Sequence, residues 1–258
     1  MMESGLSMTF INRVALVTGA GTGIGRATAE AFAREGANVV VNYSKSVAAA
    51  EEVAAGIRDR GGKAIAVQAD VSREADVIGM MERIEREFGR LDILVNNAGW
   101  STRVPHEKLW DLTDEIWDKT LNTNLRGMFY CVRAAVTMLR RNEGAAVVNI
   151  ASAAGPTGMG SSMVYAASKG AMITMTKSLA RALAPQVRVN AVAPGFVRTR
   201  FAGWPSETFD YAATISPMGR IATVDEVAEA VLFLSGAGSG ITGETIGVDG
   251  GMTALGKK

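Results

Sequence analysis

A glycine-rich loop between an apolar strand and a helix is the feature that most restricts the fold of this chain. Residues Arg13 to Thr18 form a short apolar run bounded by polar residues, which predicts a buried strand. The run Gly19-Ala-Gly-Thr-Gly-Ile-Gly25 follows at once, and Arg26 to Glu35 then predicts a helix that ends before Gly36. Glycines let the backbone approach a pyrophosphate, and the helix N-terminus attracts its charge. The arrangement therefore predicts a phosphate-binding loop.

The spacing of the glycines departs from the common dinucleotide pattern G-x-G-x-x-G. Counting from Gly19, the sixth position is Ile24 and not glycine. The pattern that fits is G-x-x-x-G-x-G, through Gly19, Gly23 and Gly25. A flexible loop without a ligand is the alternative. The strand before the loop and the helix after it favour phosphate binding.

Strands and helices alternate through the first half of the chain. The predicted strands are Val39–Asn42, Ala64–Gln68 and Leu91–Val95, and the predicted helices are Ser46–Arg60 and Glu74–Phe88. Strands that alternate with helices of this length predict a parallel sheet with helices on both faces, joined by right-handed crossovers.

The residues after the second strand bear on the choice of dinucleotide. A fold that prefers NAD places an acid there to bind the ribose 2′-hydroxyl. This chain has Tyr43, Ser44 and Lys45 instead, and a hydroxyl with a cation suits a 2′-phosphate, so the sequence favours NADP. A solvated loop charge is a nearly equal alternative for Lys45. Farther along, Asp70 either meets the adenine amino group or caps the next helix.

A phenol and an ammonium group share one helix face in the second half. Tyr165 and Lys169 are separated by four positions, and residues at this spacing lie side by side on a helix. A nearby cation lowers the pKa of a phenol, which is ordinarily about 10. Ser152 ends an apolar, strand-like run, and the glycine-rich loop after it allows its hydroxyl to approach the phenol. By itself Tyr-x-x-x-Lys is a weak signal.

Composition and charge restrict the partners. The 258 residues are 48% apolar and 21% charged, which is ordinary for a soluble protein with a large core. The net charge of +1 gives no electrostatic footprint for nucleic acid or a membrane surface, and no apolar run reaches the ~18 residues of a membrane span. Residues 1–10 lack the features of a signal peptide. A cytoplasmic location is expected.

The chain has too few cysteine and histidine residues for an internal disulfide or a typical zinc site. Cys131 is the only cysteine, so no internal disulfide can form, and its apolar surroundings indicate a core position. His106 is the only histidine, which argues against a zinc site of the usual His/Cys type. We therefore expect no metal.

Further short motifs occur in a fixed order along the chain. They are Thr18–Gly25, Asp70-Val71, Asn96-Asn-Ala-Gly99, Asn124-Leu-Arg-Gly127, Ser152, Tyr165-x-x-x-Lys169, Pro194–Thr199, Thr242-Gly-Glu and Val248-Asp-Gly-Gly251. With these motifs the chain resembles the short-chain dehydrogenase/reductase family from about Arg13 to Gly251. The resemblance implies one Rossmann-like, doubly wound α/β domain over residues 1–258, with a seven-stranded parallel sheet and helices on both faces.

The resemblance also implies roles for four side chains. Tyr165 would be the general acid in carbonyl reduction and the base in alcohol oxidation. Lys169 would lower the tyrosine pKa and bind the nicotinamide ribose, and Ser152 would polarise the carbonyl. Asn124 would hold a water in the proton path from Lys169. Asn124 lies in a predicted helix over residues 111–141, where a solvent-facing position is the alternative.

The same resemblance implies the residues that bind the cofactor, NADP or NAD. They are Gly19, Thr22, Gly23, Ile24, Gly25, Tyr43, Ser44, Lys45, Asp70, Val71, Asn97, Ala98, Gly99, Tyr165, Lys169, Pro194, Gly195, Val197 and Thr199.

Aromatic residues dominate the segment that the family uses as a substrate lid, here about residues 200–220. The lid contributes Phe201, Trp204, Phe209 and Tyr211, and the loop after Gly99 adds Trp100, Val104, Pro105 and His106. Apolar area at a cleft mouth suits a partly hydrophobic carbonyl or alcohol. We expect about half of these aromatics to pack into the domain or a subunit contact instead.

The expected function is hydride transfer between a nicotinamide cofactor and a carbonyl or secondary alcohol. Resemblance to 3-oxoacyl-[acyl-carrier-protein] reductases and glucose dehydrogenases favours a 3-oxoacyl or other ketone reductase, with an NAD-linked sugar or polyol dehydrogenase as the alternative. A non-catalytic nucleotide-sensing protein is a distant alternative. Arg140, Arg141 and Arg181 either meet an acidic acyl carrier protein or form a solvated helix face. Relatives pair through their last elements, so a homotetramer is expected.

Overall fold

The computed structural model describes residues 10–236 and 240–256. The sequence argument against a signal peptide concerns residues 1–10, of which residues 1–9 lie outside the described residues. Within the described residues, seven parallel strands form one sheet in the order β3-β2-β1-β4-β5-β6-β7. The strands are β1 (Val14–Val17), β2 (Asn38–Tyr43), β3 (Ala64–Gln68), β4 (Ile93–Asn96), β5 (Ala145–Ile150), β6 (Val187–Pro194) and β7 (Thr245–Val248). The predicted fold class is confirmed.

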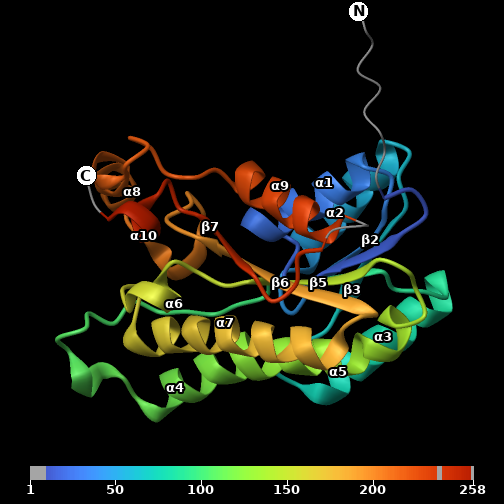
Figure 1. The fold of residues 1–258 in the computed structure, drawn as a ribbon, viewed down its shortest axis with the longest axis horizontal. Coiled ribbons are helices and arrows are strands. Elements are labelled where there is room, and N and C mark those ends of the chain that lie inside the picture. The colour runs from blue at the N-terminus through green and yellow to red at the C-terminus, as the bar shows by residue number, and fades with distance from the viewer. Residues whose placement is uncertain (1–9, 237–239, 257–258) are drawn as a thin grey trace, which may run out of the picture.

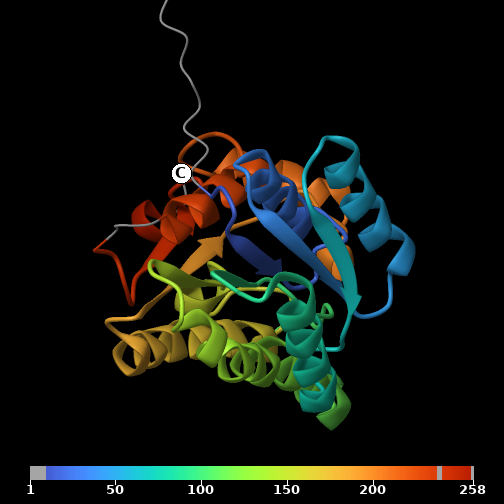
Figure 2. The same ribbon diagram turned by 90° about the vertical axis from the view of Figure 1, so that its right-hand side faces the viewer.

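Helices cover both faces of the sheet (Figures 1 and 2). On one face lie α1 (Gly23–Arg34), α2 (Val47–Asp59) and α9 (Val224–Ser235), and on the other lie α3 (Glu74–Phe88), α4 (Asp114–Leu121), α5 (Gly127–Leu139) and α7 (Met163–Leu183). Figure 1 places the short helices α6 (Ala154–Thr157) and α10 (Met252–Leu255), together with α8 (Ser206–Ile215), at one end of the sheet. No described helix is long and apolar enough to cross a membrane.

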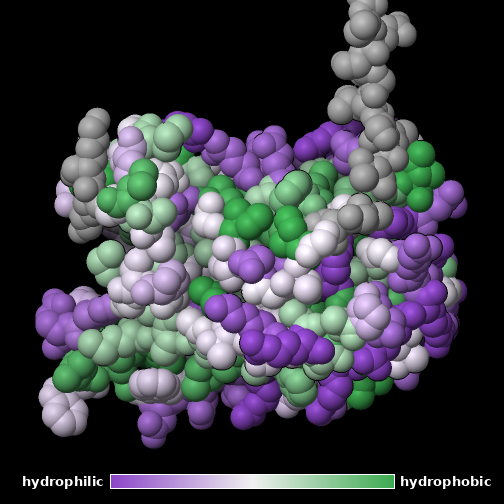
Figure 3. Space-filling view, viewed as in Figure 1, coloured by the Kyte–Doolittle hydropathy of each residue, from purple (hydrophilic) through white to green (hydrophobic). Residues whose placement is uncertain are grey.

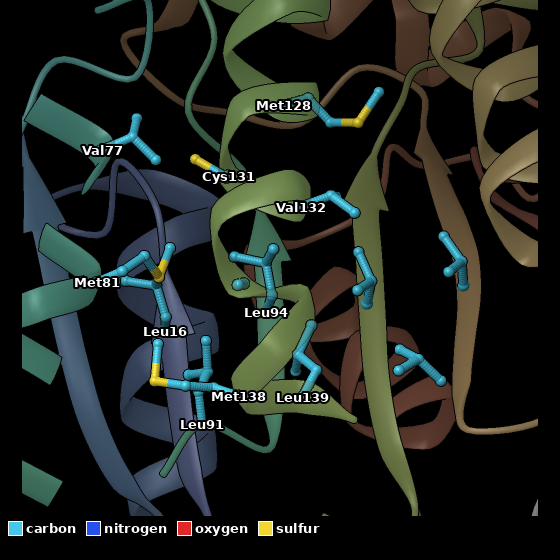
Figure 4. Close-up of a cluster of buried hydrophobic side chains, with 14 of the residues drawn as sticks. Leu16, Val77, Met81, Leu91, Leu94, Met128, Cys131, Val132, Met138 and Leu139 are labelled. Carbon is cyan, nitrogen blue, oxygen red and sulfur yellow. The ribbon is translucent and has the colours of Figure 1, made fainter. Parts of the chain in front are cut away.

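The strands are apolar on both faces because helices bury both faces. In β1, Val14 and Leu16 join the hydrophobic cluster under α3, α5 and α7, while Ala15 and Val17 join the cluster under α1, α2 and α9. This alternation follows from the two-residue repeat of a strand. Figure 4 shows the first cluster, where Leu16 and other strand residues face side chains from α3 and α5. Each fully buried side chain of this size contributes about 1.5–3 kcal/mol.

The order of the strands creates a crevice for ligands. From β1 the chain first builds outward through β2 and β3, and then returns to place β4 on the other side of β1. The connections after β1 and β4 therefore leave in opposite directions, and in sheets of this kind ligands bind outside the carboxyl ends of the strands at that point. The glycine loop, the segment after Asn96 and Ser152 all lie at this edge.

The helix predicted over residues 111–141 is present over 114–139, with one departure. It is divided into α4 and α5 by a π-helical turn, η2 (Asn122–Arg126), which contains Asn124. A π turn inserts a wider loop of backbone into a helix and is frequent at functional sites. The lid segment also has structure of its own: a 3-10 turn, η3 (Phe201–Gly203), and then α8.

Candidate active site

A cleft of about 1350 Å³ opens at the carboxyl edge of the sheet. Its walls come from the glycine loop after β1, the ends of β4, β5 and β6, the start of α7, and the lid with α8. Seventeen of the predicted site residues line it. They are Gly19, Thr22, Gly23, Ile24, Ser44, Asp70, Val71, Asn97, Ala98, Gly99, Ser152, Tyr165, Lys169, Pro194, Gly195, Val197 and Thr199.

The glycine loop is held against the end of β4 with no room for side chains. A methyl group at Gly25 would lie 2.5 Å from Asn97 Nδ2 and 2.5 Å from the Gly19 carbonyl oxygen. Gly19 has φ +62°, and a methyl group there would meet the Ala98 Cα at 3.0 Å. The Thr18 hydroxyl accepts hydrogen bonds from the amides of Asn97 and Ala98, both at 2.9 Å. This backbone cradle beside a helix N-terminus fits a dinucleotide phosphate group.

The adenosine end of the cleft differs from the prediction. Ser44 lines it, but Tyr43 and Lys45 do not, and Lys45 is exposed. The cation that does line this end is Arg26, which the sequence interpretation did not include. Its Nη1 lies 2.8 Å from a Glu52 oxygen on α2, and its first-turn position in α1 was the available signal.

Asp70 lines the cleft and also begins a turn. Its Oδ1 accepts hydrogen bonds from the amide (3.0 Å) and the hydroxyl (2.7 Å) of Ser72. Its own amide donates to Asp76 Oδ2 at 3.2 Å. The carboxylate therefore does not cap α3 itself, whose N-cap residue is Arg73.

Ser152, Tyr165 and Lys169 meet at the centre of the cleft. Ser162 caps α7 by accepting the Tyr165 amide at 3.3 Å, and the helix then places Lys169 one turn after Tyr165. Lys169 is buried, and its Nζ donates to the Ile150 carbonyl at 2.6 Å. The same Nζ lies 5.8 Å from the centre of the Tyr165 ring. A phenol, a hydroxyl and an ammonium group therefore converge on one small volume.

The pKa of Tyr165 is shifted in the direction opposite to the sequence prediction. Burial raises the pKa of the phenol to about 12, and a hydrogen bond with Ser152 opposes this rise. Burial also lowers the pKa of Lys169 to about 8. The predicted lowering of the tyrosine pKa by Lys169 is wrong for this structure, because desolvation disfavours both charged forms and the ammonium group bonds to a carbonyl instead.

Asn124 is fully buried and holds a neighbouring loop in place. Its Oδ1 accepts the Trp100 amide at 2.7 Å, and its Nδ2 donates to the Trp100 carbonyl and to Ser168 Oγ, both at 3.0 Å. The solvent-facing alternative is therefore wrong. Asn124 does not line the cleft, but Ser168 immediately precedes Lys169 in α7.

The predicted aromatic mouth is only partly formed. The Phe201 ring lies 5.8 Å from the Tyr165 ring, and Trp204, Phe209 and Tyr211 line the cleft beside it. The aromatics also pack on one another, since the Phe196 ring lies 5.5 Å from the Trp204 ring. The loop residues Trp100, Val104, Pro105 and His106 do not line the cleft.

Comparison with known proteins gives matches along nearly the whole chain. A family model described as enoyl-(acyl carrier protein) reductase matches residues 19–253. A 3-oxoacyl-[acyl-carrier-protein] reductase of Staphylococcus aureus is 39% identical over 245 residues, covering 94% of this chain and 98% of the relative. The cis-4-hydroxycyclohexanecarboxylate dehydrogenase of Sinomonas cyclohexanicum is 40% identical over 249 residues, covering 95% and 98%.

Solved structures agree with these matches. A short-chain dehydrogenase from Burkholderia cenocepacia J2315 in complex with NADP is 38% identical, with a TM-score of 0.88, and the match covers 95% of this chain and 100% of that chain. A gluconate 5-dehydrogenase from the same organism, in complex with NADP and tartrate, is 31% identical with a TM-score of 0.88, covering 96% and 98%.

The fold, the cleft and these matches define the class of the protein, an NAD(P)-dependent oxidoreductase acting on a carbonyl or hydroxyl group. Within that class the chain belongs to the short-chain dehydrogenase/reductase family.

Proposed function

We propose that this protein is an NADP-linked ketone reductase, with 3-oxoacyl compounds as the first substrate class to test. The observation that carries the proposal is the convergence of the Tyr165 phenol with the Ser152 hydroxyl and the Lys169 ammonium group inside a partly apolar cleft, where burial raises the pKa of the phenol. Such a phenol holds its proton at neutral pH and is ready to donate it to a carbonyl oxygen. The bound nicotinamide supplies or accepts the hydride.

The roles of the side chains follow from their positions. Ser152 and Tyr165 together hold the substrate oxygen, and Tyr165 transfers its proton to that oxygen. Lys169 remains a cation below pH about 8 and stabilises negative charge left on the phenol, 5.8 Å from the ring centre. Asn124 bonds to Ser168, the residue before Lys169, and so helps to fix that turn of α7. A water held beside Asn124 would return the proton to the site.

The preference for NADP has two supports. No acid follows β2 at Ser44, and Arg26, although paired with Glu30 and Glu52, adds a cation to the same end of the cleft. The B. cenocepacia relative, at 38% identity, was solved with NADP. The residues that would hold the dinucleotide are those of the glycine loop, Ser44, Asp70 and the segment from Pro194 to Thr199.

The substrate class rests on the relatives and on the apolar wall of the cleft. The S. aureus relative is a 3-oxoacyl reductase, and Phe201, Trp204 and Phe209 suit an apolar chain or ring. An acyl carrier protein would meet surface cations, but Arg141 is already bonded to Glu85 at 2.9 Å. A sugar-acid dehydrogenase is the second candidate, since the gluconate 5-dehydrogenase shares the fold at 31% identity.

We also propose a cytoplasmic homotetramer. Apolar side chains gather over α9 in Figure 3, and Phe233 of that helix is 61% exposed. A surface of this kind suits a contact with a second copy of the chain. Size-exclusion chromatography with light scattering tests the assembly, and a monomer at micromolar concentration would contradict it.

The decisive experiment is a reductase assay at 340 nm with NADPH or NADH and acetoacetyl-CoA, neutral ketones or 5-oxogluconate. Wild type should oxidise NADPH with acetoacetyl-CoA or a ketone, while Tyr165→Phe should lose at least 100-fold in kcat and keep its affinity for NADPH. Turnover retained by Tyr165→Phe would refute the mechanism. Turnover of 5-oxogluconate alone would favour the second candidate.

A parallel titration decides the cofactor. Quenching of tryptophan fluorescence measures binding, and the Kd for NADPH should be lower than the Kd for NADH. Lys45→Ala should weaken NADPH binding while sparing NADH if Lys45 reaches the 2′-phosphate. Arg26→Ala is the matched variant, because Arg26 lines the cleft and Lys45 does not. Equal losses for both dinucleotides would contradict a 2′-phosphate contact.

A further inference from the structure

The loop after β4 runs beside the cleft, and its backbone is fixed at two points. Asn124 holds both the amide and the carbonyl of Trp100, at 2.7 and 3.0 Å. Four residues later, the Val104 amide donates to the Ser161 carbonyl at 2.8 Å, and the Val104 side chain is buried. Arg103 lies directly before this second anchor. Its backbone is therefore held in place although its side chain is exposed.

The lid backbone before Trp204, unlike that loop, contains a strained turn. Ala202 and Gly203 are consecutive left-handed residues, with φ +58° and +61°. Such residues reverse the chain sharply, and a left-handed alanine is strained. Trp204 follows this turn and lines the cleft, with its ring 5.5 Å from the Phe196 ring in an edge contact. The position of Trp204 therefore depends on contacts beyond its own strained turn.

One such contact joins the loop to the lid. The guanidinium carbon of Arg103 lies 4.9 Å from the centre of the Trp204 ring, a cation–π contact. Among the ion pairs of the described residues none involves Arg103. Arg198, just before the lid, also makes a cation–π contact, with Phe209, but it is different because it pairs with Asp210 at 2.7 Å.

We propose that Arg103 is a positioning residue that fixes Trp204 as a wall of the substrate pocket. The fixed indole then favours ketones that carry a flat or ring-shaped apolar group beside the carbonyl. A small ketone is held by Ser152 and Tyr165 and gains no binding energy from the Trp204 ring. A ring packs against it, with Phe201 near Tyr165 completing the apolar surface. The inference rests on the proposed ketone reductase function and deepens it.

Two methyl ketones that differ in one substituent test the selectivity. The KM for acetophenone should rise about two- to fivefold in Arg103→Gln with kcat unchanged, which corresponds to the 0.5–1 kcal/mol of an exposed cation–π contact. The KM for 2-butanone should stay constant. Arg103→Lys retains the cation and should restore most of the acetophenone KM. Equal changes for both ketones, or a loss of kcat for both, would overturn the proposal.

Hydrogen exchange of the ligand-free protein tests the contact without any turnover. Amides of the lid from 203 to 210 should exchange faster in Arg103→Gln than in wild type, while Arg103→Lys should match wild type. Unchanged exchange in Arg103→Gln would overturn the proposal. If exchange changes as expected but wild type reduces no ketone, the proposed function and the substrate selectivity both fail, while the Arg103 contact stands.

Discussion

The tightest contact in the candidate cofactor site leads to a quantitative prediction for Gly25→Ala. The added methyl group would lie 2.5 Å from Asn97 Nδ2 and 2.5 Å from the Gly19 carbonyl oxygen. Neither atom belongs to the free end of a flexible chain. The Asn97 amide is held by bonds to the carbonyls of Thr18 at 2.8 Å and Gly19 at 3.1 Å. The methyl group can be accommodated only if Asn97 or the glycine loop moves.

The cost follows from these contacts. Overpacking a tight site costs about 1–3 kcal/mol, and each lost hydrogen bond of Asn97 costs a further 0.5–1.5 kcal/mol or so. The total is about 2–5 kcal/mol of the free energy of unfolding, even after the small gain from alanine in helix α1. With an unfolding entropy of about 2.1 cal/mol/K per residue over the 258 residues, the melting temperature should fall by about 4–9 °C.

Urea and thermal unfolding of Gly25→Ala measure this loss, and a titration with NADPH measures the effect on the cradle. Gly79→Ala is the matched control, since Gly79 lies in α3 with no atom within 4 Å of its added methyl group. The control should gain up to about 1 kcal/mol from helix propensity. A Gly25→Ala protein whose free energy of unfolding lies within about 0.5 kcal/mol of that of wild type would refute the reasoning, because the glycine loop would then have room for the methyl group.

Three further predictions concern the catalytic group and its support. Ser152→Ala should lower kcat for ketone reduction about 10²–10³-fold with an unchanged Kd for NADPH, measured by steady-state kinetics and titration, and an unchanged kcat would contradict it. Burial lowers the pKa of Lys169 from 10.5 to about 8. Between these two pH values the unfolded chain keeps a proton that the folded protein has lost, so the free energy of unfolding should rise by up to about 2 kcal/mol toward pH 9.5. Urea midpoints at pH 7.5 and 9.5 measure this rise, and Lys169→Met should reduce it. Asn124→Ala leaves the amide and carbonyl of Trp100 without their partners and should cost about 2–4 kcal/mol, measured by urea unfolding, whereas a loss below 0.5 kcal/mol would contradict the role of this amide.

The sequence predicts the sheet well because the strands carry their signal locally. Runs such as Val39–Asn42 and Ala64–Gln68 are apolar up to their last residue, as expected for strands of a parallel sheet between two layers of helices, and both form strands in the structure. The glycine loop is predictable for a similar reason, since the glycines, the strand and the helix follow one another directly. The predicted helix over 111–141 forms, but it widens into a π turn at Asn124, which bonds to Trp100 and Ser168, residues 24 and 44 positions away. No local periodicity encodes such contacts.

The adenosine end shows a second limit of local reasoning. Lys45 follows β2 directly, and its position in the sequence predicts a phosphate contact. In the structure Lys45 is exposed and does not line the cleft, while Arg26 of α1 does. Which of two nearby cations faces a crevice depends on how α1 and α2 pack, and the ion pair between Arg26 and Glu52 joins those two helices.

The pKa of Tyr165 is where local and tertiary effects compete most directly. The spacing of Tyr165 and Lys169 predicts a stabilised phenolate, but burial raises the pKa of the phenol to about 12 against the opposing effect of the Ser152 hydrogen bond. A protonated phenol suits reduction, in which the residue gives its proton, better than oxidation, in which it must first lose it. In the oxidative direction the same phenol must be deprotonated against that burial, so the rate of alcohol oxidation should continue to rise with pH above 9 while the rate of ketone reduction does not. Parallel pH profiles of the two directions measure this difference, and an oxidation rate that levels off near pH 7 would show that the bound cofactor lowers the tyrosine pKa.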